Sequence, residues 1–175
     1  MFNTFIAISL IALQLFLIIL VISWVIKAPI LRWFTQNVHT ISRVVFLGAL
    51  AGSLIYSEYF EYPPCILCWY QRLTIFPIAL LLCTANLRKS ALLRTQVLLF
   101  SVFGFAVALF HTYIDIFQPN GVDICGADGI SCSARYVYEF GFVTIPLMSA
   151  TVLLAGIVLT LLARRYPQDR VATSL

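Results

Sequence analysis

Long apolar stretches that carry no charge dominate this chain. Residues 1–26 contain no charged side chain, and further apolar runs follow them. A run of about 18 or more such residues is typical of a transmembrane helix, which must span about 30 Å of hydrocarbon at about 1.5 Å per residue. Lipid offers no partner to a free backbone N–H or C=O, and continuous apolar runs lack the alternating pattern of a membrane barrel. The sequence therefore predicts an all-α membrane protein.

The composition excludes a water-soluble domain. The chain is 62% hydrophobic and 10% charged, whereas a soluble domain has roughly 45–50% apolar and about 25% charged residues. The net charge of +4 could indicate a nucleic-acid partner, but the positive-inside rule already predicts basic residues at membrane edges. We expect contact with membrane lipid and none with nucleic acid.

Five transmembrane spans are expected. The first, within residues 1–26, has neither the basic start nor the clear cleavage site of a secretory signal, so we interpret it as a retained helix. The other four run from about Val44 to Phe60, Ile66 to Leu87, Thr95 to Phe117 and Phe140 to Ala163. The predicted architecture is a four-helix transmembrane bundle in residues 44–163. An extra N-terminal transmembrane helix and a cytoplasmic linker form residues 1–43, and a cytoplasmic tail forms residues 164–175.

Basic residues mark one side of the membrane. Alternating the five spans places every Lys and Arg except Arg72 and Arg135 on that side, which the positive-inside rule identifies as the cytoplasm. The N-terminus is then expected outside and the C-terminus in the cytoplasm. All the cysteines except Cys83 fall on the outer side.

The segment Cys65-Ile66-Leu67-Cys68 stands at the outer mouth of the third span, directly after Pro63-Pro64. A proline pair favours a helix start at Cys65. Thiols at a helix N-terminus face unpaired N–H groups and the positive end of the dipole, which lower a cysteine pKa and favour the reactive thiolate. This spacing indicates reversible disulfide chemistry.

A second pair, Cys125 and Cys132, lies in the outer loop with two glycines between them. The glycines permit the tight return that a local disulfide needs, and disulfides persist in oxidising compartments. Two alternatives stay open. Both pairs could be static bridges, although such short loops add little stability. The four cysteines could hold zinc, although only one Cys-x-x-Cys knuckle is present and we expect no metal.

Three further residues have positions that bear on the chemistry. Arg72 follows Cys68 by four residues, on one helical face with both cysteines. It could stabilise a thiolate or a reduced quinone oxygen, or it could extend to the headgroups. His111, at a similar depth in the fourth span, could donate to the same ligand or be a core histidine. Cys83 lies about 22 Å deeper than Cys68 and is interpreted as core.

The stretch Pro64 to Arg72 resembles the motif of the bacterial disulfide bond formation protein B family. Cys125 to Cys132, followed by residues 140–146, is similar to the shorter members named disulfide bond formation protein C. The resemblance covers about residues 44–163 and implies a quinone-dependent protein-disulfide oxidoreductase in the bacterial cytoplasmic (inner) membrane. Such a protein reoxidises an extracytoplasmic thioredoxin-like thiol oxidase and passes the electrons to ubiquinone or menaquinone. The extra first span departs from the family pattern and has no role that we can assign.

The resemblance also implies roles for individual residues. Cys68 is the quinone-proximal thiol with Cys65 as its partner, and Arg72 is the cation of the quinone site. Cys125 is the point of attack by the partner protein, and Cys132 resolves the mixed disulfide. His111 matches a position near the quinone.

A terminal electron acceptor other than cysteine is also required on thermodynamic grounds. A strongly oxidising partner disulfide has a reduction potential of about −120 mV, so its regeneration needs an acceptor with a still higher potential. The sequence has no nucleotide motif such as Gly-x-Gly-x-x-Gly, which favours a lipid-soluble quinone. Two rival functions remain: a vitamin-K-epoxide-reductase-like oxidase, whose shuttle cysteines come in the reverse order, and a non-catalytic membrane protein with structural disulfides.

Overall fold

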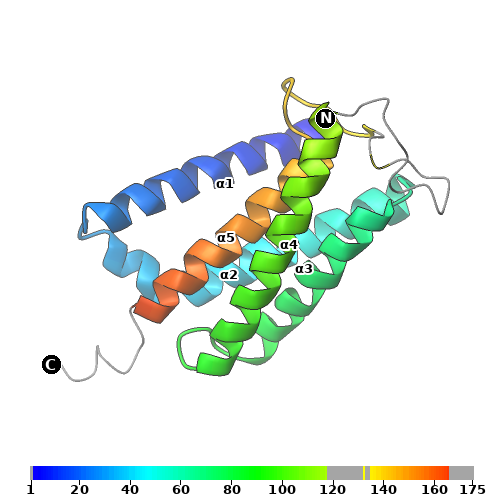
Figure 1. Ribbon diagram of the computed structural model, residues 1–175. Coiled ribbons are helices and arrows are strands. Elements are labelled where there is room, and N and C mark those ends of the chain that lie inside the picture. Colours follow the sequence, from blue (N-terminus) through cyan, green and yellow to red (C-terminus); the bar gives the residue numbers. More distant parts are fainter. Residues whose placement is uncertain (1, 118–131, 133–134, 166–175) are drawn as a thin grey trace, which may run out of the picture.

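The computed structural model describes residues 2–117, 132 and 135–165 and contains five long helices (Figure 1). All five are long and apolar enough to cross a membrane, so the predicted all-α membrane fold is confirmed. The helices are α1 (Phe2–Val25), α2 (Leu31–Leu54), α3 (Ile66–Thr84), α4 (Ala91–Phe117) and α5 (Ile145–Arg165), and a π-helical turn, η1 (Ile55–Tyr59), continues α2.

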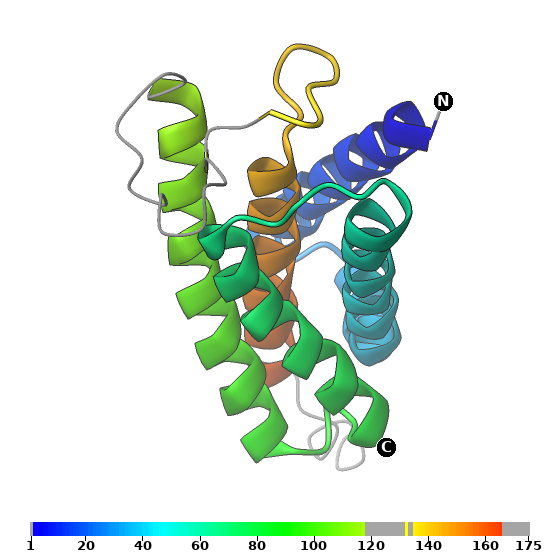
Figure 2. The same ribbon diagram turned by 90° about the vertical axis from the view of Figure 1, so that its right-hand side faces the viewer.

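Helices α2 to α5 form a four-helix bundle in which each helix packs against two neighbours in a ring. Figure 2 shows α5 between α2 and α4, with α3 in front. Helix α1 packs outside this ring, mainly against α5. The predicted four-helix bundle with an additional N-terminal helix is therefore the observed arrangement.

Small residues allow the bundle helices to approach one another closely. A Cβ atom added to Gly156 of α5 would collide with Ser101 of α4 and with the Phe46 ring of α2. One added to Gly104 of α4 would collide with Thr74 of α3. Glycine at such contacts is typical of helix packing in membranes, where van der Waals contact replaces the hydrophobic effect as the source of association.

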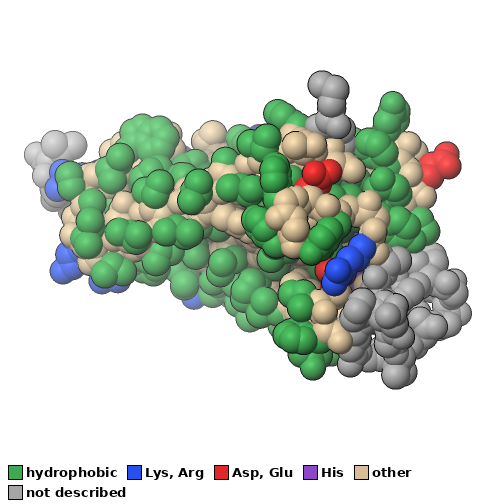
Figure 3. All heavy atoms as spheres, turned by 90° about the horizontal axis from the view of Figure 1, so that it is seen from above, with side chains coloured by type: hydrophobic (Ala, Val, Ile, Leu, Met, Phe, Trp, Pro, Cys, Tyr) green, Lys and Arg blue, Asp and Glu red, His purple; other side chains and the backbone are tan. Residues whose placement is uncertain are grey.

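Large apolar side chains cover the outside of the bundle, as expected for a surface that faces lipid. Figure 3 shows hydrophobic side chains over most of one face, Lys and Arg gathered near one end, and Asp and Glu, with a further basic side chain beside them, towards the other. At the basic end, Arg88 and Arg164 bind neighbouring helices: Arg88 donates to the carbonyl of Gln36 at 3.3 Å, and Arg164 donates to Thr95 at 3.1 Å.

Among the predicted span boundaries, the starts of the second and fifth spans differ most from the structure, and smaller differences lie at the end of α3, at Thr84 rather than Leu87, and at the start of α4, at Ala91 rather than Thr95. Helix α2 begins at Leu31 rather than near Val44, so most of the segment predicted as a linker is helical. Pro29 precedes this helix, and the stretch from Leu31 to Arg43 holds no proline or glycine that would end it. Helix α5 begins at Ile145 rather than Phe140. Phe140 and Gly141 have positive φ values of 53° and 78°, which form a turn that a helix cannot contain.

Candidate functional site

The first cysteine pair lies where the sequence predicts it, at the start of α3. Cys65 is the N-cap residue and Ile66 begins the helix. The sulfur atoms of Cys65 and Cys68 are 3.4 Å apart, and both thiols are free. Cys65 is buried and Cys68 is partly exposed. The pair is therefore positioned as a dithiol that can close to a disulfide.

Cys132, a member of the predicted second pair, lies close to the first pair. This residue is disulfide-bonded and buried, and its sulfur lies within 4.8 Å of the sulfur of Cys65. Cys125, the other predicted member of the pair, lies outside the described residues. Although 67 positions separate Cys65 from Cys132 in the sequence, their sulfur atoms are close enough for exchange after a small movement.

His111 lies between the two cysteine regions. Its Nε2 is 3.0 Å from the carbonyl oxygen of Cys132 and 3.8 Å from the sulfur of Cys65, and its Nδ1 is 3.1 Å from Nε2 of Gln71. The carbonyl can only accept, so Nε2 carries a proton, and Nδ1 can then accept from the Gln71 amide. The imidazole thus presents an N–H group beside Cys65 while Gln71 holds the other side of the ring.

Hydrogen bonds at this site favour the thiolate form of Cys65. The hydrogen bond from the Cys68 thiol has the largest effect, and a hydrogen bond from His111 adds to it. Together they outweigh burial, which acts in the opposite direction, and hold the pKa of the Cys65 thiol well below its usual range. Since the thiolate is the nucleophile in disulfide exchange, Cys65 is the activated member of its pair.

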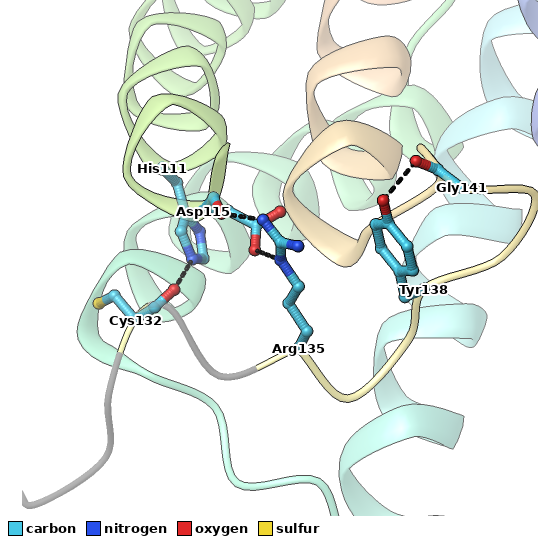
Figure 4. A network of polar contacts seen from close by, with 6 residues as sticks. All are labelled: His111, Asp115, Cys132, Arg135, Tyr138 and Gly141. Atoms are coloured by element: carbon cyan, nitrogen blue, oxygen red, sulfur yellow. Dashed lines mark hydrogen bonds and ion pairs between the residues drawn. The ribbon is translucent and has the colours of Figure 1, made fainter. Parts of the chain in front are cut away.

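An ion pair connects the segment after Cys132 to α4. Arg135 Nε lies 2.8 Å from a carboxylate oxygen of Asp115, and the same guanidinium donates to the Asp115 backbone carbonyl. Asp115 follows His111 by one helical turn, and both side chains point towards the segment that carries Cys132 and Arg135 (Figure 4). The Asp115 side chain is buried, so this contact stabilises the position of Cys132 beside His111.

Arg72 reaches across to α2. Its Nε donates to Ser53 Oγ at 2.9 Å and its Nη2 to the Ser53 carbonyl at 3.0 Å, and the guanidinium lies 5.5 Å from the centre of the Trp69 ring. Arg72 is partly buried, and these contacts fix its guanidinium against α2, where the side chain borders the same cavity as Cys65 and Cys68. The geometry favours the functional interpretation of Arg72.

The cysteine pair opens on a cavity of about 590 Å³, within the usual range for small-molecule sites. Most of its walls are apolar, and Cys65, Cys68, Arg72 and His111 lie along its polar part. Thr144, which also borders the cavity, is buried, and its hydroxyl has no hydrogen-bond partner among the described residues. An apolar ligand with acceptor oxygens would match these walls.

Cys83, by contrast, is remote from the cavity. It lies near the end of α3 opposite to Cys65, and its side chain is exposed. The interpretation of Cys83 as a core residue was therefore wrong: in a bundle of this size one side of the helix faces outward. Cys68 and Cys83 lie in the same helix, in which their sequence separation corresponds to roughly 22 Å along the axis.

A metal site is the alternative that the sequence analysis left open. Ligand atoms of Cys65, His111 and Cys132 lie within 4.8 Å of one another, close enough to hold an ion. However, the sulfur of Cys132 is committed to a disulfide, and zinc binds cysteine as the thiolate. While Cys132 is disulfide-bonded, only Cys65 and His111 of these three residues can bind a zinc ion.

Several site residues were not identified from the sequence: Gln71, Ser53, Asp115 and Thr144. Gln71 stands between Cys68 and Arg72 in the motif, and Asp115 stands one turn after His111 in the same span. Polar side chains at these positions inside apolar helices are costly unless they have partners, and this signal could have identified both. The role of Ser53 depends on the packing of α2 against α3, which no local pattern reveals.

Comparison with known proteins identifies relatives of this chain. Residues 35–163 match the family described as "Disulfide bond formation protein DsbB". The chain is 39% identical over 120 residues to a "Probable disulfide formation protein" of Oceanobacillus iheyensis, which covers 67% of this chain and 81% of the relative. It is 36% identical over 110 residues to "Disulfide bond formation protein C" of Bacillus subtilis, covering 62% and 78%.

A third relative, "Probable disulfide formation protein C 2" of Bacillus anthracis, is 34% identical over 119 residues, which are 68% of this chain and 84% of the relative. No solved structure matches the chain. The family match covers α3, α4 and α5 with the two cysteine regions, and begins within α2. The chain therefore belongs to the disulfide bond formation protein B family and is a membrane protein of disulfide bond formation.

Proposed function

We propose that this protein is a quinone-dependent protein-disulfide oxidoreductase that reoxidises an extracytoplasmic thioredoxin-like thiol oxidase. The observation that carries the proposal is the approach of Cys132 to Cys65, with sulfur atoms within 4.8 Å, at the wall of a largely apolar cavity. Two static bridges would have no need of this proximity. A relay needs it, because thiol–disulfide exchange occurs only at direct contact between sulfur atoms.

The outer step of the relay oxidises the partner protein. A partner thiolate attacks Cys125, breaks the bond from Cys125 to Cys132 and forms a mixed disulfide. The second partner thiol, rather than Cys132, then releases Cys125, because attack by Cys132 would return the partner in its reduced form. The partner leaves as a disulfide and the outer pair becomes a dithiol. Two electrons and two protons pass from the partner to the outer pair, and no other oxidant is consumed.

The inner step transfers those electrons to the first pair. With Cys65 and Cys68 joined, the Cys132 thiolate attacks Cys65 and releases the Cys68 thiolate. Cys125 then displaces Cys65 and restores the outer disulfide, which leaves the first pair as a dithiol. The N–H of His111 lies beside the sulfur of Cys65, where it stabilises the thiolate that leaves in this second displacement.

The cavity fits a quinone as the final acceptor. Its apolar walls suit the ring and tail, and the Arg72 guanidinium and the unpartnered Thr144 hydroxyl can donate to carbonyl oxygens. The chemistry that bound ubiquinone or menaquinone supplies is the acceptance of two electrons and two protons. Arg72 would hold the acceptor, and Cys68, which borders the cavity, would face it.

The orientation of the chain follows from its charges. The ends of α1, α3 and α5 meet the starts of α2 and α4 at the basic end of the bundle. The positive-inside rule makes this end cytoplasmic. We therefore propose that the N-terminus and the cysteine pairs face the outside of the bacterial cytoplasmic membrane and that the C-terminus faces the cytoplasm.

Two measurements test the proposal. Purified protein with added quinone should develop a thiolate-to-quinone charge-transfer absorbance band that is lost in Cys68→Ser. In membranes depleted of quinone, trapping of thiols should show Cys65 and Cys68 accumulating in the reduced form. Cysteines that stay oxidised without quinone would identify static bridges and contradict the relay, as would an electron acceptor other than quinone.

A further inference from the structure

Helix α1 is fixed to the bundle along its length. Near its middle, Gln14 Nε2 donates to Thr151 Oγ1 of α5 at 3.1 Å, a pairing of polar groups that apolar surroundings favour. Towards its N-terminus, Ala7 and Leu10 pack against Val143. Further along, side chains of α1 join the main core, where the Phe16 ring packs edge-on against the Phe34 ring of α2 at a centroid distance of 5.4 Å. The helix is thus an integral part of the structure.

The N-terminal half of α1 forms part of the cavity wall. Side chains spaced by one helical turn border the same space as Cys68 and Arg72: Phe5, Ile6, Ser9, Leu10 and Leu13. Four of these five are apolar, and Ser9 donates its hydroxyl to the carbonyl of Phe5 within the helix at 2.9 Å. This wall has no charged group and suits hydrocarbon.

The part of α2 that borders the cavity contains two glycines with open space beside them. Gly48 and Gly52 are one turn apart and both border the cavity, and a Cβ added to either would meet no atom within 4 Å. Described side chains therefore do not fill the space beside these glycines. The part of the cavity between α1 and α2 has room for an apolar chain, whereas its donor groups lie near the cysteines on α3.

From this geometry we infer that α1 is the outer wall of the quinone site and that its Phe5 to Leu13 face selects the acceptor by its apolar tail. The inference rests on the proposed function, and adds to it a role for a helix that precedes the residues matched by the family. The quinone ring belongs at Arg72 and Cys68, and an isoprenoid tail belongs between α1 and the glycines of α2. Contact with the tail is then made partly by a helix outside the four-helix bundle.

The test compares two quinones that share a ring, one without a side chain and one with several isoprene units. The variants are Ser9→Phe, which puts a ring at a position that borders the cavity, and Ala12→Phe, a matched control that puts the same ring at another position of α1 that does not border it. Both positions are exposed in the structure. Ser9→Phe should raise the Kd of the tailed quinone, measured by equilibrium binding to the protein in the absence of the thiol substrate, about tenfold, and its apparent KM by a similar factor. This corresponds to about two methylene groups that lose their burial. The KM for the tail-less quinone and kcat should stay as in the wild type.

Leu13→Trp, with Leu15→Trp as its control, provides a second pair if Ser9→Phe does not fold. Equal effects of Ser9→Phe and Ala12→Phe, or equal changes for the two quinones, would overturn the inference. A tailed-quinone defect in Gly48→Leu with none in Ser9→Phe or Leu13→Trp would also overturn it, because the tail would then lie away from α1. Absence of activity with both quinones in the wild-type protein would instead refute the proposed function, and this inference with it.

Discussion

The sulfur of Cys65 lies within 4.8 Å of the sulfur of Cys132, and the imidazole of His111 contacts both residues. This places the two cysteine regions in one site. The distance exceeds a disulfide bond of about 2.05 Å, but rotation of the side chains or a small shift of the segment can close it.

Removal of Cys68 and Cys125 should leave Cys65 and Cys132 to form a disulfide with each other. In the double variant Cys68→Ala, Cys125→Ala, we expect oxidation to join Cys65 to Cys132, because each has lost its local partner. Peptide mapping under non-reducing conditions would detect the bridge. Cys83 should remain unbridged in the same sample, and a Cys83 adduct of similar yield would contradict the arrangement.

Single cysteine variants should distinguish the cysteines that transfer electrons from the one that does not. Cys65→Ser and Cys68→Ser should abolish quinone-dependent oxidation of a reduced partner, because either change removes the disulfide that accepts electrons. Cys83→Ala should retain nearly full activity, since this thiol is remote from the pair. Steady-state oxidation of a thioredoxin-like substrate provides the measurement, and comparable losses in all three variants would refute the assignment.

Arg72 should be sensitive even to a change that conserves its charge. Lysine cannot donate to both oxygens of Ser53 in the same fork, so Arg72→Lys should raise the quinone KM about tenfold, equivalent to about 1.4 kcal/mol. The KM for the partner protein should change little. Kinetics with the two substrates varied separately would show this difference, and an unchanged quinone KM in both Arg72→Lys and Arg72→Gln would remove Arg72 from the site.

The reactivity of Cys65 should persist at low pH. Because its pKa is lowered, the thiolate is present above that pKa and is lost only as the pH falls through it, whereas an ordinary cysteine has a pKa of about 8.5. His111→Ala should raise the midpoint by about one to two pH units, since one hydrogen bond to the charged sulfur is lost. Alkylation of reduced protein, followed by mass spectrometry, measures the midpoint.

Thr112→Val is a suitable control for that experiment, because the Thr112 hydroxyl donates to the Ala108 carbonyl within α4 and has no hydrogen bond to a described cysteine. Its midpoint should match the wild type. If His111→Ala leaves the midpoint unchanged, the imidazole has no influence on Cys65.

Two glycines should respond oppositely to the same substitution. Gly156→Ala should destabilise the protein by about 1–3 kcal/mol, because the new methyl group collides with Ser101 and Phe46. Gly48→Ala should cause no loss of stability, since nothing lies within 4 Å of the added atom. Unfolding by denaturant in detergent micelles can compare them, and equal stabilities would contradict the packing of α5.

Much of this protein could be predicted from local sequence. Long apolar runs with few charges identify five membrane helices, because lipid allows no unpaired backbone groups. Pro63-Pro64 places Cys65 at a helix start, since proline favours an extended residue before it and a helix after it. Where these signals were weak, boundaries were wrong: the polar but unbroken stretch from Leu31 to Arg43 is helical, and a turn at Phe140 delays the last helix.

Only the tertiary structure decided which distant residues share the site. Cys65 and His111 are 46 positions apart, and their contact depends on how α3 packs against α4. The same holds for Arg72 and Ser53, which come from different helices, and for α1, whose place on the cavity wall no sequence pattern indicates. Spacing along one helix determines which side chains share a face, but contacts between helices depend on side-chain packing along their whole length.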